Sequence, residues 1–130
     1  MNQNVIICDE CNYEFPMNSV KIEETTVDVG KQVLTLVYFT CPKCRKIYRV
    51  LLKDEWYETL KKDLDQTKAR IRKNYGRNNE EIARTLNFMV NKKLTRLRNH
   101  VTRINKKFSG TFTFVASENN NEEMIVKYLP

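Results

Sequence analysis

The sequence predicts an α+β fold, in which a small β-sheet held together by four cysteines is joined to a long antiparallel helical hairpin. Three observations predict it: two C-x-x-C pairs, short β-branched and aromatic runs around them, and apolar residues at helical spacing further along. We expect the cysteine-held sheet over residues 1–53 and the helical hairpin over 54–109. Strands over 110–130 are expected to pack on the sheet and extend it, which makes one composite domain.

The cysteine pairs have the spacing of a metal site. Two residues between thiolates let one tight turn direct both sulfurs to one point, and two such turns complete a tetrahedron around Zn²⁺. Four thiolates leave no coordination position open for water, so the predicted zinc is structural. The predicted ligands are every cysteine of the chain: Cys8, Cys11, Cys41 and Cys44.

Three other roles for the cysteines compete with zinc. Two disulfides need an oxidising compartment, whereas the first residues lack the charged start and apolar run of a secretory signal, which predicts a cytoplasmic protein. A thioredoxin-like pair would open a helix, but a strand pattern over 47–52 follows Cys44. An iron–sulfur cluster also uses four thiolates and stays open as an alternative.

Between the cysteine pairs, the runs 20–29 and 31–40 are separated by Gly30, which predicts a two-stranded hairpin. Residues 33–39 are apolar at nearly every position, which predicts a strand buried on both faces. With the strand after Cys44, residues 5–52 resemble a zinc ribbon, which has a knuckle, a hairpin, a second knuckle and a third strand.

The resemblance to a zinc ribbon rests on the four cysteines, and one feature departs from it. Ribbons commonly have glycine after each cysteine pair, where the backbone is left-handed, and this chain has Asn12 and Arg45 instead. Asparagine tolerates that conformation better than arginine. We therefore expect the knuckle at Cys41 to be less regular.

Two helices are predicted after the sheet. Asp54 is placed to cap the first helix, which is expected to stop at Tyr75–Gly76, and the second begins before Glu80. The apolar residues at mostly helical spacing in the first helix are Trp56, Leu60, Leu64, Ile71 and Tyr75. The second helix repeats every seven residues at Ala83, Val90, Leu97 and Ile104, and again at Asn87, Leu94, Val101 and Phe108. This seam predicts an antiparallel hairpin, in a monomer or in a dimer that pairs through the seam.

Positive charge is concentrated in the predicted hairpin. The chain carries +7, but residues 67–108 alone hold thirteen basic residues against two acidic ones. A solvated helix surface is the plain explanation, and binding of a phosphate backbone or an acidic protein surface is the functional one. The candidate partner-binding residues, opposite the seam or near the hairpin tip, are Arg70, Arg72, Arg77, Lys92, Arg96, Arg103 and Lys107.

The composition gives little support to enzyme activity. His100 is the only histidine and is expected on the surface, and the three glycines cannot form a phosphate-cradling loop. All four cysteines are assigned to the metal, so no thiol is left as a nucleophile. We predict a protein with no catalytic residues, and with structural Zn²⁺ as its cofactor.

The composition is rich in Lys, Asn, Glu and Ile and poor in Gly, as in small phage proteins of AT-rich Gram-positive hosts. With its four cysteines and long helical tail, the chain resembles small zinc-ribbon phage proteins, including a zinc-containing type II-A anti-CRISPR protein. The resemblance implies an inhibitor that binds a Cas9-type effector in the host bacterial cell. A basic chain cannot mimic DNA, so it would hinder target-DNA loading from an acidic surface.

Two further functions stay open. A phage transcription or replication accessory protein would place the candidate partner-binding residues along nucleic-acid phosphates. A virion or scaffold component would use the heptad seam to pair between chains.

Overall fold

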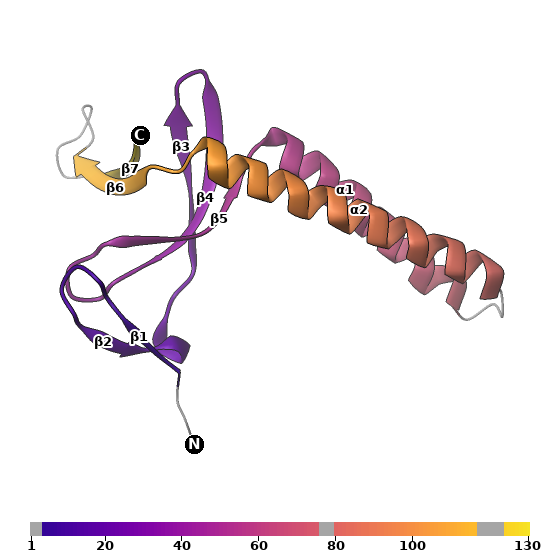
Figure 1. Ribbon diagram of the computed structural model, residues 1–130, viewed down its shortest axis with the longest axis horizontal. Helices are drawn as coiled ribbons and strands as arrows, with labels where there is room; N and C mark the ends of the chain where they lie inside the picture. The colour runs from indigo at the N-terminus through magenta and orange to yellow at the C-terminus, as the bar shows by residue number, and fades with distance from the viewer. Residues whose placement is uncertain (1–3, 76–79, 117–123) are drawn as a thin grey trace. The chain divides into compact units, whose positions relative to one another are not determined.

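The computed structural model describes residues 4–75, 80–116 and 124–130 of the 130-residue chain. Its α+β composition confirms the predicted fold class, with strands and two helices in the order drawn in Figure 1. The chain divides into two compact units, residues 1–52 with 108–130 and residues 53–107. In the described parts of the chain, no helix combines the length and the apolar composition that crossing a membrane requires.

The first unit begins with a short hairpin that the sequence did not predict. Strands β1 (Val5–Ile7) and β2 (Glu14–Pro16) pair antiparallel, and the 3₁₀ turn η1 (Met17–Ser19) follows. The middle pair of the register joins Ile6 and Phe15, and Phe15 is buried at 4% exposure. This pairing brings the chain back on itself around the first two cysteines.

The predicted hairpin at Gly30 is confirmed as part of a three-stranded sheet in the order β3-β4-β5. Val29 pairs with Gln32, which leaves a two-residue turn, and Gly30 opens that turn with a φ of 61°. A positive φ at the first turn position suits a tight hairpin and favours glycine. The strands of this sheet are β3 (Glu23–Val29), β4 (Gln32–Thr40) and β5 (Ile47–Lys53).

Strand β4 is buried chiefly on one face. Leu34, Leu36 and Tyr38 are buried, whereas the alternate positions are half-buried and Val33 is 62% exposed. The prediction of burial on both faces is therefore wrong at the Val33 end. Successive side chains point to opposite faces of a strand, and this antiparallel sheet has one well-covered face.

The two C-terminal strands form a hairpin of their own among the described residues, with strand β6 (Thr111–Ala116) paired to β7 (Met124–Leu129). They contact the three-stranded sheet through side chains rather than extending it by hydrogen bonds. Tyr38 meets Phe114 edge to face with ring centroids 6.2 Å apart. The Arg49 guanidinium lies over the Phe112 ring at 4.9 Å and donates to the carbonyl oxygen of Gly110 at 3.1 Å.

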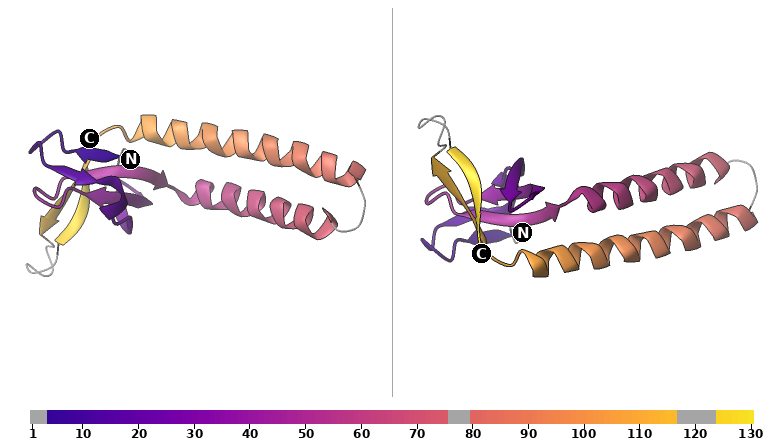
Figure 2. Two further views of the ribbon diagram at one scale, coloured as in Figure 1. Left: turned by 90° about the horizontal axis from the view of Figure 1, so that it is seen from below. Right: turned by 90° about the horizontal axis from the view of Figure 1, so that it is seen from above.

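The second unit is the predicted antiparallel helical hairpin, which Figure 2 shows from two sides. It consists of α1 (Glu55–Tyr75) and α2 (Glu80–Lys107). The predicted ends are confirmed, and the loop residues 76–79 lie outside the described residues. Asp54 caps α1 as predicted, because its carboxylate accepts the backbone N–H of Tyr57 at 2.7 Å. At 28 residues, α2 is about 42 Å long.

The seam between the two helices differs from the prediction by a small rotation of each helix. On α1 the buried positions are Tyr57, Leu60, Leu64 and Thr67, at alternating spacings of three and four, and on α2 they are Leu86, Leu97, His100 and Ile104. Trp56 was expected on this face, but it is 53% exposed because Tyr57 occupies the seam position. Asn87 is likewise exposed, and Phe108 belongs to the first unit. Contacts between α1 and α2 of one chain fill the seam.

Polar side chains occupy two places in the seam. The Lys93 ammonium donates to Asp63 Oδ1 at 2.9 Å and to Thr67 Oγ1 at 2.8 Å. His100, expected on the surface, is only 8% exposed, and its Nε2 lies 2.8 Å from Asp54 Oδ1. That prediction was wrong because a carboxylate 46 positions earlier supplies the partner that a buried imidazole needs.

Candidate metal centre

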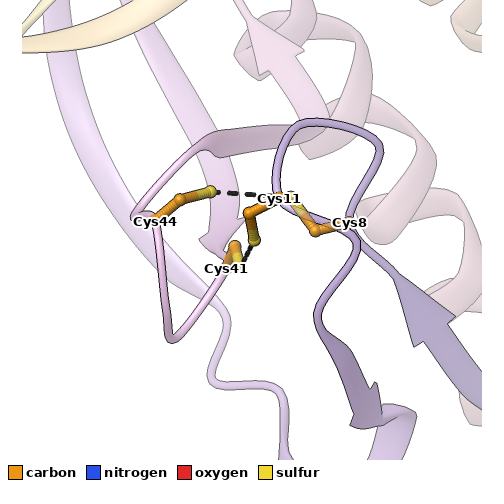
Figure 3. A group of neighbouring side chains, drawn as sticks. All are labelled: Cys8, Cys11, Cys41 and Cys44. Atoms are coloured by element: carbon orange, nitrogen blue, oxygen red, sulfur yellow. Dashed lines mark hydrogen bonds between the residues drawn. The ribbon is translucent and has the colours of Figure 1, made fainter.

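The structure brings the four cysteines together. Cys8 and Cys11 lie on the turn between β1 and β2, Cys41 and Cys44 lie between β4 and β5, and Figure 3 shows the side chains converging. Their sulfurs all lie within 4.8 Å of one another, with the closest pairs 3.5 Å and 3.6 Å apart. A tetrahedral ion with bonds of about 2.3 Å places its four sulfurs about 3.8 Å apart, so the arrangement fits one metal ion.

The same geometry does not fit two of the other roles considered for the cysteines. All four cysteines are free, and their closest sulfurs are far beyond the roughly 2.05 Å of a disulfide bond. The second pair leads into strand β5 rather than into a helix, which does not fit a thioredoxin-like motif.

The two knuckles have the same backbone hydrogen bonds. In each, the N–H of the first cysteine donates to the carbonyl oxygen five residues later, and the N–H four residues later donates back to that cysteine's carbonyl. The bonds are Cys8 to Tyr13 at 3.0 Å, Asn12 to Cys8 at 2.8 Å, Cys41 to Lys46 at 3.0 Å and Arg45 to Cys41 at 2.9 Å. Equivalent turns direct both cysteine pairs toward one point.

The expected irregularity at the second knuckle is not observed. Asn12 and Arg45 adopt nearly the same left-handed backbone, with φ of 60° and 64°. For a residue with a Cβ this conformation costs about 1–2 kcal/mol. The Arg45 guanidinium lies 5.4 Å from the centroid of Phe114, and an exposed cation–π contact of this kind contributes about 0.5–1 kcal/mol. The contact therefore offsets only part of the backbone cost.

Tyr48 supports the site from strand β5. Its hydroxyl lies 3.1 Å from Cys8 Sγ and 2.7 Å from Asp9 Oδ1, and the Lys46 ammonium approaches the same carboxylate oxygen at 2.7 Å. The hydrogen bond from Tyr48, followed by backbone N–H groups of the knuckle, lowers the pKa of Cys8 to about 6. A thiol that ionises readily is prepared for metal binding, because the thiolate is the ligand.

An apolar cluster lies directly behind the sulfurs. Cys8, Phe15 and Cys41 form its buried part, and Phe39 stacks on Tyr48 with ring centroids 5.2 Å apart. A bound ion would thus join the β1–β2 hairpin to the three-stranded sheet beside this apolar cluster. Since all four ligands come from the protein, the site is suited to a structural role.

The predicted partner-binding residues do not all share one face. Lys92, Arg96, Arg103 and Lys107 are exposed on α2 and fall within an arc of about 60° over about 22 Å of helix. We call these four residues the basic stripe. Arg70 and Arg72 are exposed on α1, but two positions on a helix point about 200° apart. Arg77 lies outside the described residues.

One aromatic residue beside the basic stripe was missed in the sequence analysis. Phe88 is 61% exposed, and the Lys92 ammonium lies 4.9 Å from its ring centroid. The signal was present in the sequence, because residues four apart on a helix are neighbours. An exposed phenylalanine next to cations adds an apolar contact point to the stripe.

Charge is divided unequally between the two units. Residues 53–107 hold sixteen basic and seven acidic residues, for a net charge of +9, whereas the remaining residues hold seven basic and nine acidic ones, for −2. Four thiolates around a divalent ion would add a further −2 to the first unit. The helical unit therefore exerts the stronger long-range attraction on anions.

Comparisons of the chain with family models, with curated proteins and with solved structures found no match.

Proposed function

We propose that this chain is a non-enzymatic binding protein whose basic stripe docks on an acidic surface of a macromolecular partner. The observation that supports it most is the exposure of Lys92, Arg96 and Arg103 along one side of a unit with a charge of +9. Within the described ranges, Arg96 and Arg103 have no carboxylate at ion-pairing distance. Two such arginines on one side of the helix favour an external anionic surface.

The proposed ion is Zn²⁺, with Cys8, Cys11, Cys41 and Cys44 as its ligands. A tetrahedral set of four sulfurs suits zinc, and also iron. The metal would supply folding free energy rather than chemistry, because no coordination position is left for a substrate. One equivalent of zinc in protein purified under reducing conditions supports this proposal, whereas bound iron contradicts it.

The partner to test first is a Cas9-type effector, because the resemblance to small zinc-ribbon phage proteins implies it. A positively charged stripe would repel the basic channel that holds nucleic acid in such an effector, so DNA mimicry does not fit. Contact with an acidic outer surface or a mobile lobe fits the charge and would hinder target-DNA loading. On this proposal the protein is phage-encoded and acts in the cytoplasm of the host cell.

Nucleic-acid binding is the alternative function, and the pairing of Phe88 with Lys92 favours it. A cation beside an exposed ring offers contacts to a phosphate and to an unpaired base. If four phosphates are contacted, affinity for duplex DNA should fall about 100-fold between 50 and 200 mM salt. A transcription or replication accessory role would follow from such binding.

A matched pair of variants tests the stripe. The stripe variant is Lys92→Gln/Arg96→Gln/Arg103→Gln, and the control is Lys21→Gln/Lys31→Gln/Lys127→Gln, which removes the same charge from exposed positions of the first unit. Both are mixed with purified Cas9, with and without guide RNA, and with labelled duplex DNA at 50 mM salt.

The proposal predicts that the control variant forms a stoichiometric complex with Cas9 and the stripe variant does not. Equal binding by both variants contradicts the role of the stripe. If neither the original protein nor the control binds Cas9 at moderate salt, that partner is wrong. Duplex binding that weakens with salt and with the stripe substitutions then supports the alternative function.

A further inference from the structure

A pocket of about 430 Å³ lies in the first unit, beside the second knuckle. Its walls include apolar side chains of Ile47, Phe114 and Met124, with Thr113 adding a hydroxyl. The candidate metal ligand Cys44 also lines it, together with charged side chains of both signs: Glu10, Arg45 and Lys46. The pocket thus combines an apolar patch with several convergent polar groups, and such groups are what fixes the orientation of a bound small molecule.

Arg45 is the unexplained residue of this pocket. It has the left-handed backbone conformation that a glycine would adopt without strain. The stabilisation from its cation–π contact with Phe114 is no larger than the free-energy cost of that conformation. Stability alone therefore does not account for an arginine at this position. Residues kept in disfavoured backbone conformations cluster at binding sites.

The charge of Arg45 is available to a ligand. The other cation at the pocket, Lys46, lies 2.7 Å from an Asp9 carboxylate oxygen and is neutralised there. No such ion pair involves Arg45 in the parts of the chain that the structure describes. Its guanidinium lies against the Phe114 ring, and this contact limits the orientations that its planar fork of N–H donors can take.

We propose that this pocket binds a small carboxylic acid with an apolar body. A guanidinium fork matches a carboxylate in two parallel hydrogen bonds. The apolar part of the ligand lies against Ile47, Phe114 and Met124. Glu10 and the proposed Cys44 thiolate also line the pocket and disfavour a second negative charge, so a monoanionic carboxylate binds better than a phosphate dianion.

The probes are benzoate, phenyl phosphate and uncharged benzyl alcohol, added to the metal-loaded protein and followed by amide shifts in NMR spectra. The test variant is Arg45→Gly, which removes the guanidinium while keeping the left-handed backbone without strain. Asn12→Gly makes the same backbone change in the first knuckle and serves as the control.

We expect saturable benzoate shifts at the pocket residues, unchanged in the Asn12→Gly variant and at least 10-fold weaker in Arg45→Gly. Benzyl alcohol should bind weakly in all three proteins, and Glu10→Gln should improve binding of phenyl phosphate. Benzoate binding that survives in Arg45→Gly, an absence of benzoate shifts, or tighter binding of phenyl phosphate to the original protein would overturn the proposal. None of these results depends on the basic stripe.

Discussion

The contact between Asp54 and His100 makes a quantitative prediction about the helical hairpin. The Asp54 carboxylate accepts the N–H of Tyr57 at 2.7 Å and lies 2.8 Å and 3.1 Å from His100 Nε2 through its two oxygens. One side chain therefore caps α1 and satisfies a buried imidazole of α2. His100 Nδ1 is buried without a partner among the described residues, so the ring depends on Asp54.

The substitution Asp54→Ala removes both interactions. Loss of the helix cap costs about 1 kcal/mol, and leaving a buried donor unpaired costs about 1–3 kcal/mol, so the free energy of unfolding should fall by about 2–4 kcal/mol. Asp54→Asn should cost less, because asparagine also caps helices well. In a His100→Leu background no buried imidazole is left unpaired, and Asp54→Ala should cost only the cap, about 1 kcal/mol.

Urea unfolding followed by circular dichroism at 222 nm measures these differences, since the two helices dominate that signal. The four proteins of the double-mutant cycle should show a coupling energy between Asp54 and His100 of about 1–3 kcal/mol. A coupling near zero, or an Asp54→Ala cost no larger than that of a lost cap, would refute the reasoning that the pair is an energetic unit.

The other predictions concern the first unit. If the cysteines hold the proposed ion, chelation or Cys41→Ser should lower the stability of this unit by several kcal/mol, because metal binding would supply folding free energy, and an unchanged melting curve in a calorimeter would contradict a structural ion. Tyr48→Phe keeps the ring stack but loses the hydroxyl next to Cys8 Sγ, so metal affinity in a chelator competition should fall about 10- to 100-fold, whereas Tyr13→Phe should match the original protein. Gly110→Ala should destabilise by about 3 kcal/mol, because its Cβ would overlap the backbone of the last strand. Gly30→Ala, with open space around it, should cost only about 1 kcal/mol, and calorimetric melting of the first unit measures both glycine variants.

The metal site and the order of the elements could be predicted because they rest on local patterns. Two C-x-x-C turns define their own geometry, and the hairpin turn and both helix ends carry short signals in the sequence. The second knuckle was wrongly expected to be irregular, because the prediction considered only how poorly arginine tolerates a positive φ. It did not consider the contacts that Arg45 makes in the folded protein. Its backbone hydrogen bonds and the ring of Phe114, more than 60 positions later, were not visible in the sequence.

The seam of the hairpin was less predictable because polar residues take part in it. Taken alone, Lys93 and His100 look like surface residues, but carboxylates on or before α1 draw Lys93 partly and His100 fully into the seam. A prediction from apolar residues alone therefore placed the seam slightly to one side of the face that is buried in the structure. The C-terminal strands raised the same difficulty, since side-chain packing and not hydrogen bonding joins them to the sheet.

The helical hairpin is an insertion in the sequence of the sheet unit, because residues 108–130 return to the same unit as residues 1–52. Lengthening, shortening or replacing the inserted segment should leave the cysteine turns unchanged, because both turns lie before it in the sequence. Deleting the strands after the hairpin would instead remove Phe112 and Phe114, which contact Arg49 and Tyr38 of the three-stranded sheet. If the proposed docking through the basic stripe is right, recognition of a partner and integrity of the core reside in separable stretches of sequence, and selection for a new target could act on the insert alone.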